Sequence, residues 1–207
     1  MQTGTVHIVD DDAALRTALV RLCGSAGLKA TGHPDASHLL ANPDVERPAC
    51  ILLDVRLTHA DGLDVQAQFQ ASGTTIPIIF LTGYGTIPMT VRAMRGGAVE
   101  FLTKPAEEED ILAAIDRALA LDAASLSAEA ARGALAGRLA SLTGRERDVF
   151  DLAIGGLMNK QIAAELGVSE ITAKVHKRRV MEKMEARSLA DLVRMAGELG
   201  IDALRQR

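Results

Sequence analysis

Six polar residues in the first half of the chain follow short apolar runs and carry the groups that phosphoryl chemistry needs: Asp10, Asp11, Asp12, Asp54, Thr82 and Lys104. Carboxylates gathered in one place repel each other and need a cation, and a set of oxygen ligands suits Mg²⁺. An aspartate beside such a cation can attack a phosphoryl group as a nucleophile. A hydroxyl and an ammonium group would then contact the phosphoryl oxygens, where negative charge builds up. These residue types predict a phosphoryl-transfer site if the fold brings them together.

The elements that must position these residues alternate between strand and helix. Apolar runs predict strands over five ranges: 5–9, 29–32, 51–55, 76–81 and 99–102. Helical spacing follows each run, over 13–26, 35–41, 63–71, 88–95 and 107–121. This succession is typical of an α/β fold, a doubly wound five-stranded parallel sheet with helices on both faces. The carboxyl ends of parallel strands meet at one edge, where ligands bind, so the six polar residues are expected in one cleft.

Other chemically active side chains of this half indicate structural roles. Asp12 is expected to cap the first helix, since an acid after a strand is commonly a turn or N-cap residue. Four histidines lack metal-ligand spacing and are expected at the surface or at strand ends: His7, His33, His38 and His59. Cys23 and Cys50 show no CxxC pattern, which favours buried thiols in a reducing compartment over a disulfide or a zinc site.

Composition and charge divide the chain into two parts. Residues 1–121 carry 9 basic and 15 acidic residues, a net charge of −6, and residues 122–207 carry 14 and 12, a net charge of +2. This asymmetry indicates two domains with different partners. Aromatic residues make up only 2% of the chain, so stacking platforms for single-stranded nucleic acid are not expected. With no secretory signal and no apolar run of roughly 20 residues, we expect a cytoplasmic chain without a membrane partner.

The second half is expected to be entirely helical. Residues 122–141 are rich in alanine and predict a helical linker that is interrupted at Gly133 and Gly137. A small four-helix domain follows, with helices predicted over 144–154, 159–166, 170–184 and 188–199. The expected domain boundaries are therefore 1–121 for the α/β domain, 122–141 for the linker and 142–207 for the helical domain.

Two of these helices have the spacing of a helix–turn–helix, because only three residues, Gly167-Val168-Ser169, separate them. At about 100° per residue, one face of the second helix is apolar and carries Ala173, Val180 and Met184. The opposite side carries Lys174, Val175, Arg178 and Arg179. A face that mixes basic and small apolar side chains can read base edges in the major groove of DNA. A generic helical bundle with a solvated charged face, or a dimerisation cap, is the alternative.

Residues 5–121 resemble the receiver domains of two-component response regulators, especially those of the FixJ and StyR type. The stretches that carry the resemblance are VHIVDDD (6–12), LLDVRL (52–57) with Gly62, LTGYG (81–85) and PMTVRAMRGGAVEFLTKP (88–105). The resemblance implies a flavodoxin-like sheet with the strand order 2-1-3-4-5 and a phosphoacceptor at Asp54. It also implies that Mg²⁺ is held by Asp10, Asp11, Asp54 and the backbone carbonyl of Arg56.

The same resemblance implies roles for the remaining pocket residues. Thr82 and Lys104 would contact the phosphoryl group, Thr82 and Phe101 would be the switch residues, and the Lys104–Pro105 peptide would be cis. The chain departs from the family at two positions. Thr58 stands where the family usually has proline, and Ala106 stands where it often has phenylalanine. Neither departure is expected to touch the phosphoryl pocket.

Residues 142–193 resemble the LuxR-type helix–turn–helix domain of the same regulators. This resemblance implies that three side chains lie at groove-contacting positions, namely Lys174, Val175 and Arg178. Three more would be available to DNA phosphates, namely Lys177, Arg179 and Lys183. The last helix would be a dimer contact on DNA.

These observations predict a DNA-binding transcriptional regulator, not an enzyme, that a sensor histidine kinase phosphorylates on Asp54. Its partners would be the kinase, double-stranded promoter DNA and a second copy of the chain, with RNA polymerase as a further candidate. Phosphorylation is expected to create a two-fold dimer in which Arg92 and Arg95 of one copy face Asp110 and Asp116 of the other. The alternatives are a regulator that works without phosphorylation and an Mg²⁺-dependent phosphotransfer enzyme.

Overall fold

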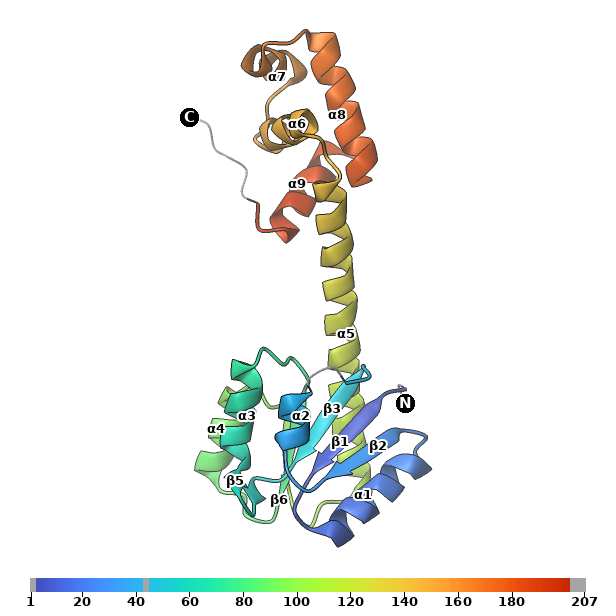
Figure 1. The fold of residues 1–207 in the computed structure, drawn as a ribbon, viewed down its shortest axis with the longest axis vertical. Coiled ribbons are helices and arrows are strands. Elements are labelled where there is room, and N and C mark those ends of the chain that lie inside the picture. The colour runs from blue at the N-terminus through green and yellow to red at the C-terminus, as the bar shows by residue number, and fades with distance from the viewer. Residues whose placement is uncertain (1–2, 43–44, 202–207) are drawn as a thin grey trace. The chain divides into compact units, whose positions relative to one another are not determined.

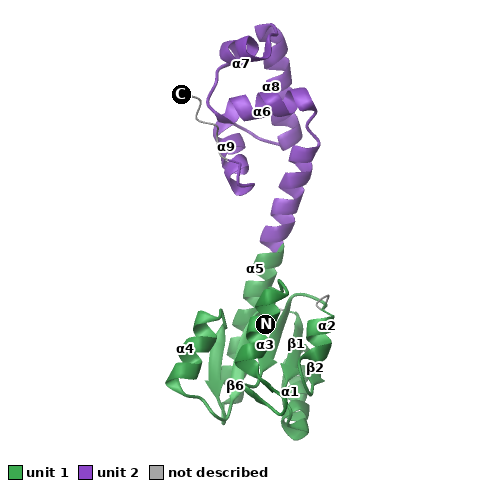
Figure 2. Ribbon diagram, turned by 60° about the vertical axis from the view of Figure 1, so that its left-hand side comes forward, with its two compact units in different colours: residues 1–126 green, residues 127–207 purple. Residues whose placement is uncertain are grey.

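The computed structural model describes residues 3–42 and 45–201, and the chain divides into two compact units, Met1–Leu126 and Ser127–Arg207 (Figure 2). One helix, α5 (Glu108–Ala140), begins in the first unit and ends in the second. Within the described residues, none of the helices combines the length and the apolar character that a membrane crossing requires.

The first unit is built on a five-stranded parallel sheet with the strand order β2-β1-β3-β6-β7 (Figure 1). Its strands are β1 (Thr5–Val9), β2 (Lys29–His33), β3 (Ala49–Leu53), β6 (Ile78–Thr82) and β7 (Glu100–Thr103). Counted along the chain, this is the predicted order 2-1-3-4-5. A small hairpin that was not predicted, β4 (Arg56–Leu57) with β5 (Ala60–Asp61), follows β3. The carboxyl ends of the five strands share one edge, which is where ligands bind in open parallel sheets.

Helices cover both faces of the sheet, because alternate residues of a strand point to opposite sides. On one face, α1 (Ala13–Ser25) and α5 pack against Ile8, Leu52 and Ile79. The other face carries Leu53 and Phe80 and is covered by α2 (Ser37–Ala41), α3 (Gly62–Ala71) and α4 (Ile87–Arg95). The three central strands, β1, β3 and β6, are thus buried on both sides, which explains why their sequences lack strict alternation.

Cys23 and Cys50 are fully buried free thiols in the layer between the sheet and α1, as predicted. Burial raises the pKa of Cys23 to about 11 and that of Cys50 to about 12. Both thiols therefore stay protonated at neutral pH and act as small apolar side chains.

Helix α5 continues without a break through Gly133 and Gly137, so the predicted interruption is wrong. Each glycine costs a helix only about 1 kcal/mol relative to alanine, and the surrounding residues are strong helix formers. The helix is also anchored within the first unit by Asp122, which is fully buried. Its carboxylate pairs with Arg47 and accepts the backbone N–H of Ala49 at 2.8 Å, at the start of β3.

The second unit is helical, with α6 (Gly144–Ile154), α7 (Asn159–Leu166), α8 (Glu170–Met184) and α9 (Leu189–Glu198). These ranges match the four predicted helices to within one residue at each end. Each helix contributes apolar residues to one core, among them Phe150, Ile162, Val180 and Leu192. Leu135, near the end of α5, is buried in the same core.

His7 and His33 form a buried pair between β1 and β2. Nδ1 of His7 lies 3.2 Å from Nε2 of His33, and each residue is only 8% exposed. The ring of His38, on α2, stacks on that of His33. His33 lies at the end of a strand, as predicted. His7 lies in the middle of β1 and is buried, so the prediction of a surface or strand-end position is wrong for it. Burial lowers the pKa of His7 to about 4, and the charges of His33 and His38 add to this effect.

We predict that this histidine pair makes the chain less stable in mild acid. The folded chain keeps His7 neutral down to about pH 4, whereas the unfolded chain takes up a proton near the ordinary pKa of 6.5. Protons therefore favour the unfolded chain, and stability falls as the pH drops from about 6.5 toward 4, by roughly 2–3 kcal/mol. Urea unfolding at a series of pH values measures this loss.

The variant His7→Gln should show a flatter pH profile than the wild type over the same range. His59→Gln removes an exposed histidine and serves as the matched control, which should follow the wild-type profile. If His7→Gln lost stability with falling pH as steeply as the wild type, the loss would have to come from other groups.

Candidate functional site

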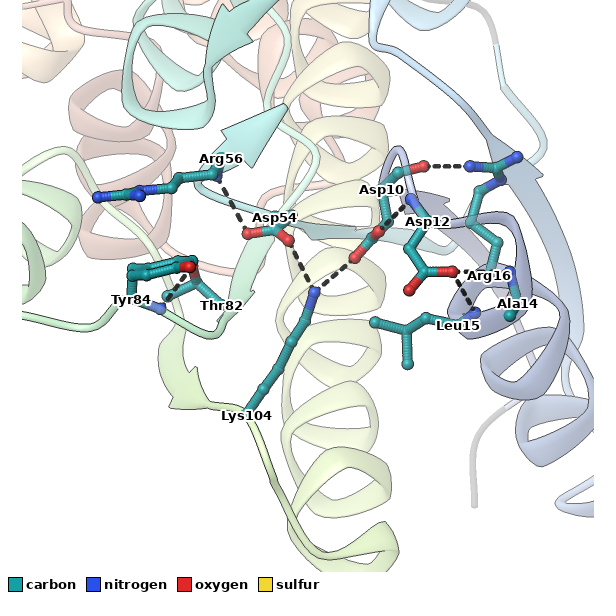
Figure 3. Close-up of polar contacts among 10 residues, drawn as sticks. All are labelled: Asp10, Asp12, Ala14, Leu15, Arg16, Asp54, Arg56, Thr82, Tyr84 and Lys104. Atoms are coloured by element: carbon teal, nitrogen blue, oxygen red, sulfur yellow. Dashed lines mark hydrogen bonds and ion pairs between the residues drawn. The ribbon is translucent and has the colours of Figure 1, made fainter. Parts of the chain in front are cut away.

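Lys104 joins two buried carboxylates at the carboxyl edge of the sheet (Figure 3). Its Nζ donates to Asp10 Oδ2 at 2.6 Å and to Asp54 Oδ2 at 2.7 Å. Asp10 follows β1 and Asp54 follows the neighbouring β3, whereas Lys104 comes from the loop after β7. Burial by itself would lower the pKa of Lys104, but the hydrogen bonds to Asp10 and Asp54 and the negative charges of both together outweigh it, and the pKa is raised. The ammonium group therefore stays charged and compensates carboxylates that would otherwise repel each other.

Asp11 completes a group of three carboxylates that fits a small divalent cation. One oxygen each from Asp10, Asp11 and Asp54 lie within 4.8 Å of one another. The donors are all carboxylate oxygens and outnumber the one ammonium group beside them, so the set suits Mg²⁺. Asp12 stays outside this group. Its carboxylate accepts the N–H groups of Ala14 and Leu15 and caps α1, as predicted.

Thr58 contradicts the expectation that both departures from the family pattern lie away from the pocket. Its hydroxyl, in the turn between β4 and β5, donates to Oδ2 of Asp11. This hydrogen bond is the main reason why the pKa of Asp11 is lowered. The contact depends on the path of a short hairpin that the apolar pattern does not encode, and no other sequence signal could have found it.

Thr82 and Arg56 both lie on the side of the acceptor candidate Asp54 that faces away from Asp10 (Figure 3). Thr82 is fully buried at the end of β6, and its hydroxyl oxygen accepts the backbone N–H of Tyr84 at 3.4 Å. The backbone N–H of Arg56 donates to Asp54 Oδ1 at 3.1 Å. Its guanidinium group stacks on the ring of Tyr84, 3.8 Å from the ring centre (Figure 3). Tyr84 was not singled out in the sequence, although it follows Thr82 by only two residues.

Phe101 lies on β7, beside the strand that ends in Thr82. Its ring is partly buried and packs against Phe80, with 5.9 Å between the ring centres. The Lys104–Pro105 peptide that follows this strand is cis, as the resemblance implied. The structure thus brings the predicted pocket residues to one edge of the sheet.

Helix α8 presents basic and apolar side chains on its exposed side. Its inward face is fully buried and consists of the three predicted residues, Ala173, Val180 and Met184. The exposed side carries Lys174, Val175, Arg178 and Arg179, with Lys177 half-buried beside them. Ile171, which is 78% exposed, was missed. Its place four residues before Val175 was the signal that could have included it in the same stripe.

The turn between α7 and α8 has the predicted three residues. Gly167 ends α7 with a φ of +64°, a left-handed conformation that glycine adopts without strain. The hydroxyl of Ser169 then accepts the N–H of Thr172 at 3.1 Å and caps α8. These two ends set the direction in which the exposed side of α8 faces.

Lys183 is engaged within the second unit. Its Nζ lies 2.6 Å from Oε2 of Glu146, on α6, and donates to the carbonyl oxygen of Ser141 at 2.9 Å. The hydrogen bond from Lys183 lowers the pKa of Glu146 to about 2. This ammonium group therefore holds α8 against α6, a structural role that the sequence did not suggest for it.

The predicted dimer residues lie on helices that flank the edge strand β7. Arg95 on α4 and Asp110 on α5 are exposed, and Asp116 is half-buried. Arg92 pairs with Asp64 of α3 at 2.6 Å, so its charge is already compensated within the unit. The sequence analysis overlooked the apolar residues that α4 exposes at helical spacing, namely Ile87, Val91 and Met94.

Two family models match the chain. The model described as "Response regulator receiver domain" matches residues 6–116. The model described as "Bacterial regulatory proteins, luxR family" matches residues 140–196. The two matches correspond to the parts of the chain that carry the acidic pocket and the helix α8.

The chain is also similar to individual proteins along almost its whole length. It is 45% identical to "Nodulation protein W" of Bradyrhizobium diazoefficiens over 198 residues, which are 96% of this chain and 87% of that protein. It is 41% identical to "Transcriptional regulatory protein FixJ" of Azorhizobium caulinodans, over 95% of this chain and 93% of that protein. The solved structure of the response regulator StyR has a TM-score of 0.84 and 44% identity, and covers 96% of this chain and 100% of that one.

Proposed function

The chain belongs to the two-component response regulators that join a receiver domain to a LuxR-type DNA-binding domain, and we propose that phosphorylation of Asp54 controls its binding to DNA. The observation that carries the proposal is the pocket in which Lys104 bridges Asp10 and Asp54 beside the exposed carboxylate of Asp11. The phosphoryl donor would be a phosphohistidine of a sensor kinase. The target would be promoter DNA, and we infer a cytoplasmic location from that target.

In this proposal Asp54 is the nucleophile. One of its carboxylate oxygens attacks phosphorus, the bond from phosphorus to the imidazole nitrogen breaks, and the kinase histidine leaves. The residues that would hold Mg²⁺ are Asp10, Asp11, Asp54 and the backbone carbonyl of Arg56. The bound ion supplies positive charge for the phosphoryl oxygens. Lys104 would move from Asp54 to a phosphoryl oxygen while keeping Asp10, and the hydroxyl of Thr82 would donate to another oxygen.

Thr82 and Phe101 would carry the signal away from the pocket. The Thr82 hydroxyl, which now accepts from Tyr84, would turn to the phosphoryl group and leave space beside the strand. The half-buried ring of Phe101 would rotate into that space and change the surface formed by α4, β7 and α5. The phosphoryl group would thus bias an element with two positions, as a ligand-driven switch requires.

The first test of this function is the substitution Asp54→Asn, which removes the nucleophile and preserves the size of the side chain. We expect intact-mass measurement with acetyl phosphate and Mg²⁺ to show one phosphoryl adduct on the wild type and none on this variant. Asp12→Asn is the control, because Asp12 lies next to the pocket and only caps α1. A phosphoryl adduct on Asp54→Asn under the same conditions would place the acceptor elsewhere.

We propose that α8 enters the major groove of DNA. Lys174, Val175 and Arg178 would face base edges, because all three are exposed and Arg178 lies about one helical turn after the other two. Lys177 and Arg179 flank this stripe and would contact phosphates. Lys183 is left out of the proposed DNA contacts, since its ammonium group is engaged with Glu146.

The second test concerns sequence reading. Lys174→Ala and Arg178→Ala should each weaken binding to the cognate operator by about 1–3 kcal/mol, and should weaken binding to random DNA much less. Arg145→Ala is the control, because it removes an exposed arginine from α6 rather than from α8. Fluorescence anisotropy with both DNAs at fixed salt measures the difference. Equal losses on cognate and random DNA would assign both side chains to phosphates instead of bases.

We further propose that phosphorylation creates a two-fold dimer through the edge that α4, β7 and α5 form. The exposed apolar residues Ile87, Val91 and Met94 would supply the area that the dimer buries. They are needed because exposed ion pairs alone add little to the stability of an interface. Arg95 of one copy would meet Asp110 of the other, with Arg92 and Asp116 near the rim. A dimer doubles the DNA contacts and brings two half-sites into register.

The third test uses sedimentation of the phosphorylated chain. The wild type should sediment as a dimer, and both Val91→Glu and Arg95→Glu should shift it toward the monomer. The double variant Arg95→Glu with Asp110→Arg reverses the proposed ion pair and should recover the dimer. A dimer that neither single variant weakens would rule out this edge as the interface.

A further inference from the structure

Thr58 occupies a position from which it can act on the acidic pocket. Its hydroxyl donates to Asp11 Oδ2, from the turn of the hairpin that β4 and β5 form. Proline, which the family usually has at this position, has neither a hydroxyl nor a backbone N–H to donate. The contact is therefore a property of this chain's own residue and not of the fold.

Asp11 differs from the other two carboxylates of the pocket in how it is held. Asp10 and Asp54 are buried, and Lys104 holds both of them with short hydrogen bonds. Asp11 is exposed and has no hydrogen bond to Lys104. Across residues 3–42 and 45–201, the one hydrogen bond between the carboxylate of Asp11 and another side chain comes from Thr58. That hydrogen bond restrains the rotation of an exposed side chain.

The hairpin that carries Thr58 is tied to the acceptor residue at both of its ends. At the entry, the N–H of Arg56 donates to Asp54 Oδ1 at 3.1 Å. At the exit, the N–H of Gly62 donates to the carbonyl oxygen of Val55 at 2.7 Å, and Gly62 packs so closely that a Cβ there would lie 2.3 Å from the carbonyl oxygen of Asp54. The turn therefore holds Thr58 at a set distance from Asp54, and through Thr58 it holds Asp11.

We propose that Thr58 is a positioning residue for the Mg²⁺ site, because its hydroxyl restrains the carboxylate of Asp11, one oxygen of which lies within 4.8 Å of oxygens of Asp10 and Asp54. This inference rests on the proposed function, in which Asp11 is one of the residues that hold Mg²⁺. Mutation of residues that orient metal-ligating side chains commonly lowers metal affinity or activity by about 10–100-fold. Thr58 is exposed, so we expect a smaller effect.

The test is a titration of the full chain with Mg²⁺. Binding is measured at each step by the fluorescence of Tyr84, the chain's single tyrosine. No tryptophan masks this signal, and the ring of Tyr84 stacks on Arg56 beside Asp54. Thr58→Val, which removes the hydroxyl and keeps the shape, should raise the Kd for Mg²⁺ about threefold to tenfold. Thr58→Ser restores a hydroxyl and should return the Kd to within about twofold of the wild type.

Ser37→Ala is the matched control. Ser37 lies on the wall of the same surface pocket as Asp11 and Thr58, but its hydroxyl donates to Asp35, outside the acidic group. This variant should bind Mg²⁺ as the wild type does. At saturating Mg²⁺, all variants should reach the same extent of phosphorylation from acetyl phosphate, because Thr58 acts on the ion's affinity and not on the nucleophile.

The possible outcomes distinguish a failure of the proposed function from a failure of the role proposed for Thr58. If the wild type showed no Mg²⁺ binding and no phosphorylation, the proposed function would fail and this inference with it. If the wild type bound Mg²⁺ and Thr58→Val bound it equally well, only the role of Thr58 would be overturned. Should the branched methyl of valine disturb the turn, Thr58→Ala removes the hydroxyl without it, and an unchanged Kd there would be equally decisive.

Discussion

The repulsion between carboxylates at one edge of the sheet is the constraint on which the first unit depends. Asp10 and Asp54 are buried at the ends of adjacent strands, where an uncompensated charge is costly. Lys104 supplies the positive charge from the loop after the last strand, so all three strand ends must share one edge. The parallel order β2-β1-β3-β6-β7 meets this requirement. Because Lys104 contacts only two of the three carboxylates, the pocket keeps an excess of negative charge, which favours a divalent cation.

The second unit meets a different constraint, since one helix must serve the core and an exposed surface at once. Helix α8 does so by periodicity, with Val180 and Met184 fully buried and Lys174 and Arg178 on the opposite side. Its last turn also contacts the core of the unit, through the buried Met184 and through the ammonium group of Lys183. Lys183 pairs with Glu146, whose carboxylate also accepts the N–H of Thr143 at the start of α6. The orientation of the exposed side of α8 thus depends on a buried acid in another helix.

Where the sequence analysis failed, it had given local signals more weight than the tertiary structure does. Gly133 and Gly137 were expected to interrupt a helix, but α5 runs through both, because two weak helix formers do not outweigh the strong ones around them. His7 was expected at the surface or at a strand end, but it lies inside β1 and faces His33 on the neighbouring strand β2. In each case, the position within a long helix or a packed sheet decided the outcome.

Residue types and periodicity by themselves determined the parallel α/β sheet, the four C-terminal helices, the three-residue turn at Gly167 and the group of pocket residues, whereas the strand order came from the resemblance to receiver domains. They could do so because strand ends in a parallel sheet and faces of a helix follow from spacing alone. Only the tertiary structure decided which partner each polar side chain takes. Thr58 binds Asp11, Lys183 binds Glu146 and Arg92 binds Asp64. Such pairs form where separate segments of backbone happen to approach within hydrogen-bond distance, and that approach depends on the paths of turns and the packing of helices, which no residue pattern encodes.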